Sequence, residues 1–219
     1  GWPVAAYGRR PRAVLNMPFS EEIPTLTPVG ITRWKGEEWI TQRALDTANF
    51  TVEKDALTLC GNGLDLCDRK MQGLLLVRQQ ERAFTAETAL EIPAAGTAGL
   101  TCYYDEHSYL KFGIGPEGLL LEEYAGYEVV SMQTAPLPAS TSHVRLRVTA
   151  TDGQRHFAIQ DGTDWHTLWS IPEPRYLTSE GLQCGKRFTG AMVGLYVHGA
   201  SAVRFADWVA VWPHPEEKR

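Results

Sequence analysis

Aromatic side chains are the residues of this chain whose type and spacing suggest a chemical task. The sequence has seven Trp and eight Tyr in 219 residues. Flat aromatic faces stack on the C–H surfaces of sugars, while the polar edges of Tyr and Trp hydrogen-bond hydroxyl groups. Tyr196, Trp208 and Trp212 have matching parity if the two strands that carry them pair as a hairpin. These three residues are therefore the candidate carbohydrate-binding platform, and the alternative is that their rings fill the core.

Catalytic carboxylates are not arranged as a glycosidase built on a β-sandwich requires. Such an enzyme needs two carboxylates on one face, placed across the scissile bond. The chain instead carries the adjacent pairs Glu37-Glu38 and Glu122-Glu123, whose members point to opposite faces of a strand. The sequence contains no G-x-S-x-G elbow and no P-loop. We therefore expect no catalytic residue in this chain.

Two motifs match functional patterns but are explained more simply as turns. Asp105-Glu106-His107 contains metal-binding and acid–base groups, yet adjacent side chains on a strand diverge, so we expect a solvated loop tip. Gly113-Ile-Gly-Pro-Glu-Gly118 fits G-x-G-x-x-G, but the short, strand-like Leu119–Tyr124 follows it where a dinucleotide site needs a helix. We expect a hairpin turn there. The sequence implies no cofactor and no catalytic metal, and leaves open only a structural calcium ion.

The elements that must position these residues are short strands. Phe84–Ile92 and Val144–Val148 alternate between apolar and polar residues, and Asp152-Gly153 is a hairpin signal. Near the end of the chain, Phe188–Gly199 and Ala202–Trp208 read as a pair of strands joined by a Gly/Ala/Ser loop. Many short strands separated by frequent turn signals predict an all-β fold of the sandwich or jelly-roll type.

Charge and cysteine spacing narrow the class of protein. The net charge is −5 and no basic block is present, which argues against nucleic acid or an anionic membrane as a partner. None of the four cysteines forms a C-x-x-C pair, so a zinc site is not expected. Cys60 and Cys67 flank a Gly-Asn-Gly turn and can pair in an oxidising compartment; the alternative is that all the thiols are reduced.

The first 30 residues differ in composition from the rest of the chain. Proline recurs there and apolar alternation is poor. Because proline lacks the N–H that a central strand donates, this segment predicts an irregular arm. The expected organisation is an arm at 1–30 followed by one β-sandwich at 31–219.

Short motifs follow one another in a fixed order along most of the chain. They include Leu76-Val-Arg-Gln-Gln80, Ala98-Gly-Leu-Thr-Cys-Tyr-Tyr-Asp105, Phe157…Asp161-Gly162, Phe188-Thr-Gly-Ala-Met-Val-Gly-Leu195 and Ala206-Asp-Trp208. In order and spacing they resemble the C-terminal concanavalin A-like β-sandwich domain of glycoside hydrolase family 43. The resemblance implies a jelly-roll sandwich with no catalytic group of its own.

The resemblance also implies partners and a location. Enzymes of this family are mostly inverting β-xylosidases and α-L-arabinofuranosidases that degrade hemicelluloses such as xylan, and their catalytic Asp, Glu and second Asp lie on a five-bladed propeller. Gly1-Trp-Pro-Val4 resembles the point where that propeller ends, so residues 1–30 would lie along it. The implied partners are the propeller and xylo- or arabino-oligosaccharides. A bacterial cytoplasmic location is expected, with secretion as the alternative.

Three functions remain open at this stage. The first is a non-catalytic accessory domain that packs on the propeller and helps to shape its active-site pocket. The second is a free-standing carbohydrate-binding module for xylan-type sugars, supported by the aromatic content. The third is an independent enzyme on this fold, supported only by scattered carboxylates.

Overall fold

The computed structural model describes residues 32–42, 47–137, 142–185 and 189–213. Within them it contains fifteen β-strands and two 3-10 turns, η1 (Thr47–Asn49) and η2 (Arg175–Leu177). The all-β expectation is confirmed. The arm expected at 1–30 lies outside the described residues. No helix in the described part of the chain is long and apolar enough to cross a membrane.

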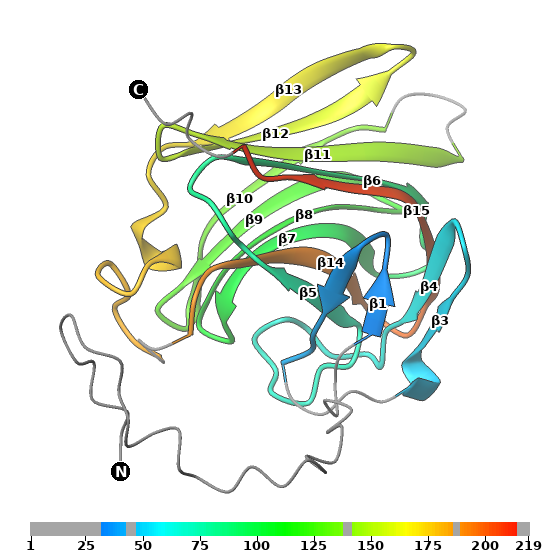
Figure 1. Cartoon of the computed structure of the whole chain (residues 1–219), viewed down its shortest axis with the longest axis horizontal. Coiled ribbons are helices and arrows are strands. Elements are labelled where there is room, and N and C mark those ends of the chain that lie inside the picture. The colour runs from blue at the N-terminus through cyan, green and yellow to red at the C-terminus, as the bar shows by residue number, and fades with distance from the viewer. Residues whose placement is uncertain (1–31, 43–46, 138–141, 186–188, 214–219) are drawn as a thin grey trace, which may run out of the picture.

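Two antiparallel sheets stack face to face as a sandwich (Figure 1). The six-stranded sheet has the order β10-β9-β8-β7-β14-β5. Its strands are β5 (Leu74–Arg78), β7 (Thr97–Asp105), β8 (Ser108–Gly115), β9 (Gly118–Ala125), β10 (Glu128–Ala135) and β14 (Met192–His198).

The seven-stranded sheet has the order β13-β12-β11-β6-β15-β4-β3. Its strands are β3 (Phe50–Val52), β4 (Ala56–Cys60), β6 (Phe84–Glu91), β11 (His143–Thr151), β12 (Gln154–Asp161), β13 (Asp164–Ile171) and β15 (Ala202–Val211). A separate ribbon is formed by β1 (Thr32–Trp34) and β2 (Glu37–Trp39).

The main core lies between the sheets and follows the alternation of the sequence. On β6, Phe84, Ala86 and Leu90 are buried, while Glu87 on the other face is partly exposed. β11 alternates in the same way. Because successive side chains on a strand point to opposite faces, this pattern places one apolar face of each strand in the core. The period-two pattern predicted for both strands is confirmed.

Turn chemistry fixes the hairpins that sequence patterns predicted. Asp152 and Gly153 both have positive φ, 50° and 82°, as the tight turn between β11 and β12 requires. Gly115 pairs with Gly118 across the turn between β8 and β9, and Gly118 has a φ of 126°. The hairpin expected at 113–118 is therefore confirmed.

The expectation that the last two strands pair with each other is wrong. β14 lies between β7 and β5 in one sheet, whereas β15 lies between β6 and β4 in the other. The loop between them is hydrogen-bonded to the segment that follows β4: the Gly61 N–H donates to Ser201 O at 2.9 Å, and the Gly63 N–H donates to Gly199 O at 3.1 Å. The Gly/Ala/Ser loop thus crosses from one sheet to the other.

All four cysteines are free thiols in the structure, so the pairing of Cys60 with Cys67 is not formed.

Candidate functional site

The outer face of the six-stranded sheet carries three tyrosines in a row, on β7, β8 and β9. Tyr103 lies opposite Tyr109, and Tyr109 lies opposite Tyr124. The ring centroids are 6.2 Å and 4.7 Å apart, and both pairs are stacked. Directly opposed residues have Cβ atoms about 5 Å apart, so three rings in register must contact one another. We call Tyr103, Tyr109 and Tyr124 the tyrosine row; only Tyr124 is partly exposed.

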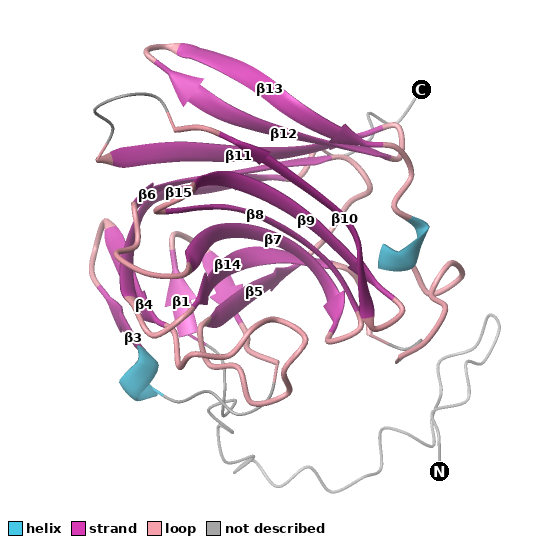
Figure 2. Cartoon of the chain, turned by 180° about the vertical axis from the view of Figure 1, so that it is seen from behind, coloured by secondary structure: helices cyan, strands magenta, loops and turns pink. Residues whose placement is uncertain are grey.

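A loop at 61–73, between β4 and β5, covers this face (Figure 2). Leu66 and Met71 of the loop are buried against Tyr103, Tyr109 and their neighbours, in a hydrophobic cluster separate from the main core. The loop approaches β14 closely: a Cβ on Gly61 would lie 2.8 Å from the carbonyl oxygen of Val197. Glycine is therefore needed at that contact.

A buried lysine fastens the loop to the sheet. Lys111 on β8 is 2% exposed, and its Nζ lies 2.7 Å from Asp65 Oδ2 and 3.0 Å from Glu122 Oε1. His198 Nδ1 lies 3.3 Å from the same Asp65 oxygen. Because a buried charge without a partner is costly, each carboxylate supports the position of the lysine. The network makes this face a fixed structure.

Tyr109 of the row, and Tyr196 and Cys67 on the same face, are held in their neutral forms. Burial, and then the negative charge of Asp65, raise the pKa of Tyr109 far above its usual range. Burial also raises the pKa of Tyr196 and of the Cys67 thiol, and Asp65 adds to the shift at Cys67. Neutral phenols stack and donate hydrogen bonds, and a protonated thiol is a poor nucleophile. The chemistry available to these groups is packing and binding.

The expectation of a solvated loop tip at Asp105-Glu106-His107 is wrong. Asp105 is 3% exposed and Glu106 is 2% exposed. Arg69 Nε lies 2.8 Å from Glu106 Oε1, and the His107 N–H donates to Asp105 Oδ1 at 2.9 Å. The turn is buried because residues distant in sequence, such as Arg69 and Gln42, close over it. Among the residues described, no group of three His, Cys, Asp or Glu is placed to hold a metal ion.

The three residues of the predicted carbohydrate platform do not form one surface. Tyr196 is fully buried on β14, beneath the 61–73 loop. Trp208 on β15 is 3% exposed, and its ring contacts Trp39 with centroids 4.7 Å apart. Trp212 is half-buried, 5.5 Å from the ring of Phe84. The three side chains were expected on one face of a hairpin, but β14 and β15 belong to different sheets. Sugar binding at these residues stays a prediction, and of the three only Trp212 is partly exposed.

Sequence reasoning missed the tyrosine row, although a signal for it exists. A hairpin at Asp105–Ser108 brings this tyrosine-rich strand end next to Tyr109, but a regular register would place Tyr104 opposite Tyr109. A β-bulge between Tyr103 and Asp105 places Tyr103 there instead. No sequence pattern predicted that Lys111 would fasten the loop, because its partner Asp65 is 46 residues away in the chain.

An apolar strip is exposed beside the tyrosine row. It consists of Tyr127, Val129, Val130 and Met132, each about half exposed or more. β10 is an edge strand of the six-stranded sheet, and among the described strands it pairs only with β9. Exposed apolar edges invite aggregation unless a partner covers them. We call these four residues the β10 strip.

Tyr127 is also held in an unfavourable backbone conformation. Its φ is 75°, which is rare for a bulky side chain. The turn is maintained by a Gly126 N–H···O=C bond to His107 at 3.1 Å and by the His107 and Tyr127 rings, 4.1 Å apart. Strained residues that the surroundings hold in place occur preferentially at functional sites. The strain therefore marks this end of the strip as the candidate contact surface.

Comparisons with known proteins give a family and a fold. A family model described as the β-xylosidase C-terminal concanavalin A-like domain matches residues 35–209. Curated protein sequences give no significant match.

Three solved structures illustrate the likeness in fold. The GH43 BlXynB protein of Bacillus licheniformis aligns with a TM-score of 0.61 at 22% identity, covering 78% of this chain and 40% of its own. A xylan β-1,4-xylosidase of Bacillus halodurans aligns at 0.68 and 21% identity, covering 78% and 36%. A GH43B protein from a xyloglucan locus of Bacteroides ovatus aligns at 0.68 and 21%, covering 82% and 38%. This chain therefore spans less than half of each of these chains.

Proposed function

The chain belongs to the family of β-xylosidase C-terminal concanavalin A-like domains, and from this premise we propose that it acts as the non-catalytic partner of a family 43 catalytic propeller. The observation that carries the proposal is the extent of the family match. Residues 35–209 run from the turn of the β1–β2 ribbon into β15, and so include both sheets. The whole enzyme would cleave xylosides or arabinofuranosides of hemicellulose.

The catalytic groups are proposed to come from the propeller. The solved structures of similar fold are far longer than this chain, which corresponds to 40% or less of each. In the sandwich itself, the side chains of the tyrosine row and of the Lys111 network pack against or bind the 61–73 loop. Their neutral phenols and paired carboxylates suit a scaffold better than acid–base catalysis.

The β10 strip is the surface proposed to contact the propeller. It offers adjacent apolar side chains on an edge strand, and domain interfaces bury such surface at about 25 cal/mol per Å². Rigid support lies directly behind it, since Tyr124 of the tyrosine row pairs with Val129. A fixed apolar surface costs little conformational entropy when it binds.

The turn that carries Tyr127 is proposed to help shape the propeller's active-site pocket. It contacts the buried turn at His107, whose neighbour Glu106 is locked by Arg69. A loop end fixed by buried charges can limit the space above a pocket, which favours attack on the ends of chains.

Hydrolysis of nitrophenyl β-xyloside and α-L-arabinofuranoside tests this division of labour. We expect no turnover by this chain alone, and a higher kcat/KM for the propeller with the chain than without it. Turnover by the chain alone that persists through further purification would favour the independent enzyme instead.

The carbohydrate-binding module is the second candidate, and its original support is weaker. Burial of Tyr196 and Trp208 removes two of the three rings on which it rested. Titration with xylo-oligosaccharides distinguishes it, because a module of this kind binds them without any propeller.

A further inference from the structure

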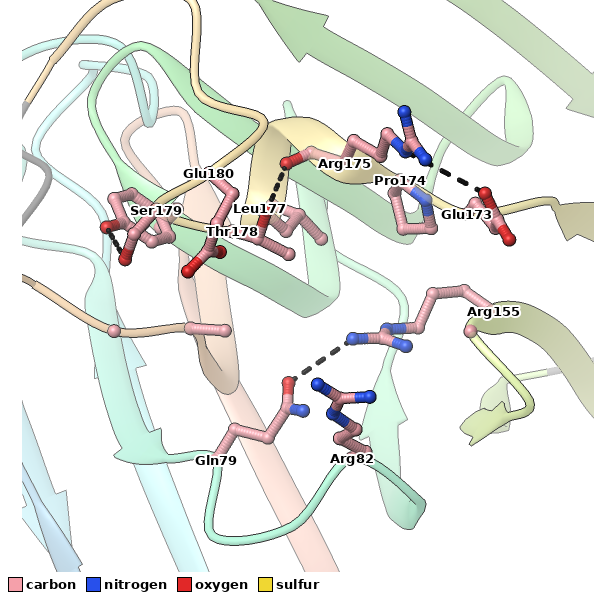
Figure 3. Close-up of a pocket in the computed structure, with 14 residues that line it drawn as sticks. Gln79, Arg82, Arg155, Glu173, Pro174, Arg175, Leu177, Thr178, Ser179 and Glu180 are labelled. Atoms are coloured by element: carbon pink, nitrogen blue, oxygen red, sulfur yellow. Dashed lines mark hydrogen bonds and ion pairs between the residues drawn. The ribbon is translucent and has the colours of Figure 1, made fainter.

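A polar cleft opens between the η2 segment and the strand ends at Gln79, Arg82 and Arg155, and none of its lining residues belongs to the tyrosine row (Figure 3). Its volume is about 620 Å³, within the range of pockets that hold small molecules. Five segments line it: the β5–β6 loop, Tyr104 of β7, the β11–β12 turn with the start of β12, the η2 segment and residues 190–191. Both sheets therefore contribute to its walls.

A buried guanidinium forms part of the floor. Arg155, near the start of β12, is 7% exposed, and its guanidinium lies 5.2 Å from the centroid of the Phe84 ring. Its Nη2 donates to Gln79 Oε1 at 3.3 Å. Its Nε has no hydrogen-bond partner among the described residues, and no described carboxylate forms an ion pair with it. Buried charges are normally paired, so this one lacks the anion that its surroundings call for.

A second guanidinium faces the same space. Arg82 on the β5–β6 loop lies beside Arg155 and Gln79, and both guanidinium groups point into the cleft (Figure 3). No ion pair joins Arg82 to any described carboxylate. Gln79 is itself held, because its Nε2 donates to Glu81 O at 2.8 Å. The floor thus combines a buried guanidinium that Gln79 and Phe84 hold in place with an exposed one beside it, and an anion between them would offset their mutual repulsion.

The opposite wall supplies hydroxyl groups. Tyr104 OH and Ser179 Oγ are 3.1 Å apart, at the side of the cleft away from the arginines. Glu180 lies on the same side as Ser179, whereas Glu173 lies at the other end of the η2 segment, where its Oε2 is 3.8 Å from Arg175 Nε. Hydroxyl and carboxylate groups on this side suit the hydroxyls of a sugar ring.

We infer that this cleft binds a sugar acid of the uronic class, with Arg155 and Arg82 holding its carboxylate. Guanidinium groups bind carboxylates through two parallel hydrogen bonds, which suits a planar anion between two arginines. Gln79 is a positioning residue that orients Arg155. The hydroxyl wall then receives the ring hydroxyls.

The character of the cleft favours a sugar over a protein side chain as the source of the carboxylate. Protein interfaces have apolar centres that are depleted in charge, and most of the large apolar side chains exposed in the described part of the chain lie on the β10 strip. The cleft is concave and polar instead. This inference does not rest on the propeller partnership, and either can fail without the other.

Calorimetric titration of the 219-residue chain with sodium D-glucuronate tests the inference, with D-glucose and sodium acetate titrated in parallel. We expect glucuronate to bind with a Kd on the order of 1 mM, typical of a single small ligand, and both controls to bind at least tenfold more weakly. Arg155→Met and Arg82→Ala should each weaken glucuronate binding at least tenfold. Arg204→Ala is the matched control. Arg204 is an exposed arginine of β15 whose guanidinium lies near Glu53, and its replacement should leave glucuronate binding unchanged.

Arg82 keeps the test decisive if Arg155→Met does not fold, because Arg82 is exposed and its removal should leave the circular dichroism spectrum unchanged. Three results would overturn the inference: no binding of glucuronate at about 20 mM, equal binding of glucose or acetate, or binding that Arg82→Ala leaves intact.

Discussion

Lys111 Nζ lies 2.7 Å from Asp65 Oδ2, and this contact joins the sheet to a loop 46 residues away in sequence. Lys111 sits beneath the 61–73 loop that carries Asp65, and Glu122 of β9 completes the charge network. The tyrosine row and the turn at 105–108 occupy the same face. The rigidity of the proposed scaffold therefore depends on a few buried polar contacts as well as on the main core.

Replacing Lys111 by methionine should destabilise the protein strongly. The change leaves Asp65 and Glu122 without their cation, and removal of one partner from a buried ion pair costs about 3–5 kcal/mol. Urea unfolding monitored by fluorescence measures the loss. Lys35→Met is the matched control: its pair with the largely exposed Asp55 should contribute less than about 1 kcal/mol. Equal effects of the two substitutions would contradict a buried network.

Stability should fall in strongly alkaline solution. The folded-state pKa values of Tyr109 and Tyr196 are raised above the unfolded value near 10 by burial first. The folded state thus keeps protons that the unfolded state releases, so their contribution is complete below about pH 10 and is lost as pH rises further. Each group contributes a slope of up to about 1.4 kcal/mol per pH unit.

The pH dependence is checked by measuring urea unfolding between pH 8 and pH 11, in steps of about half a pH unit. Tyr109→Phe should make the decline above pH 10 shallower, because it removes one of the groups responsible. Tyr127→Phe, at an exposed position, should leave the slope as it is. A decline of the same slope in all three proteins would exclude Tyr109 as its source.

Trp208→Ala should unfold the protein at a much lower temperature. The indole is 3% exposed and packs against Trp39, and truncating a buried tryptophan costs about 3–5 kcal/mol. Trp212→Ala, at the half-buried ring beyond β15, should cost clearly less. Calorimetric melting compares them. A surface platform would give the reverse picture, with little change in stability for either and a loss of sugar binding for both.

Tyr127→Gly should stabilise the isolated chain while weakening its binding to the propeller. Glycine adopts a φ of 75° without steric cost, so about 1 kcal/mol of strain is relieved. The same change removes an exposed aromatic ring from the β10 strip. Tyr127→Asn is a useful comparison, because asparagine tolerates this backbone region better than tyrosine. A loss of stability in both variants would show that the ring contact with His107 outweighs the strain.

Local patterns in the sequence predicted individual strands and hairpins well. The alternation at Phe84–Ile92 and the Asp152-Gly153 turn report on neighbouring residues, and the structure confirms both. The family resemblance, which rests on ordered motifs, is also confirmed.

Burial that depends on distant segments could not be predicted from the same patterns. Asp105 and Glu106 look solvent-exposed in sequence, yet Arg69 and Gln42 close over Glu106. Tyr196 and Trp208 looked like neighbours on one face, but the loop between them crosses from one sheet to the other. Arg82 precedes β6 and Arg155 lies near the start of β12, 73 residues later, and only the strand order β12-β11-β6 brings the two to the same end of one sheet.

Binding of this chain to a family 43 propeller domain from the same organism is the most direct test of the account. Titration by biolayer interferometry should give a Kd of about 1 µM or tighter. Met132→Glu, in the β10 strip, should weaken binding at least tenfold. Val211→Glu, at a similarly exposed valine on β15, should leave it unchanged. No binding at about 100 µM propeller, or equal binding by the Met132 variant, would contradict the proposed partnership or its surface.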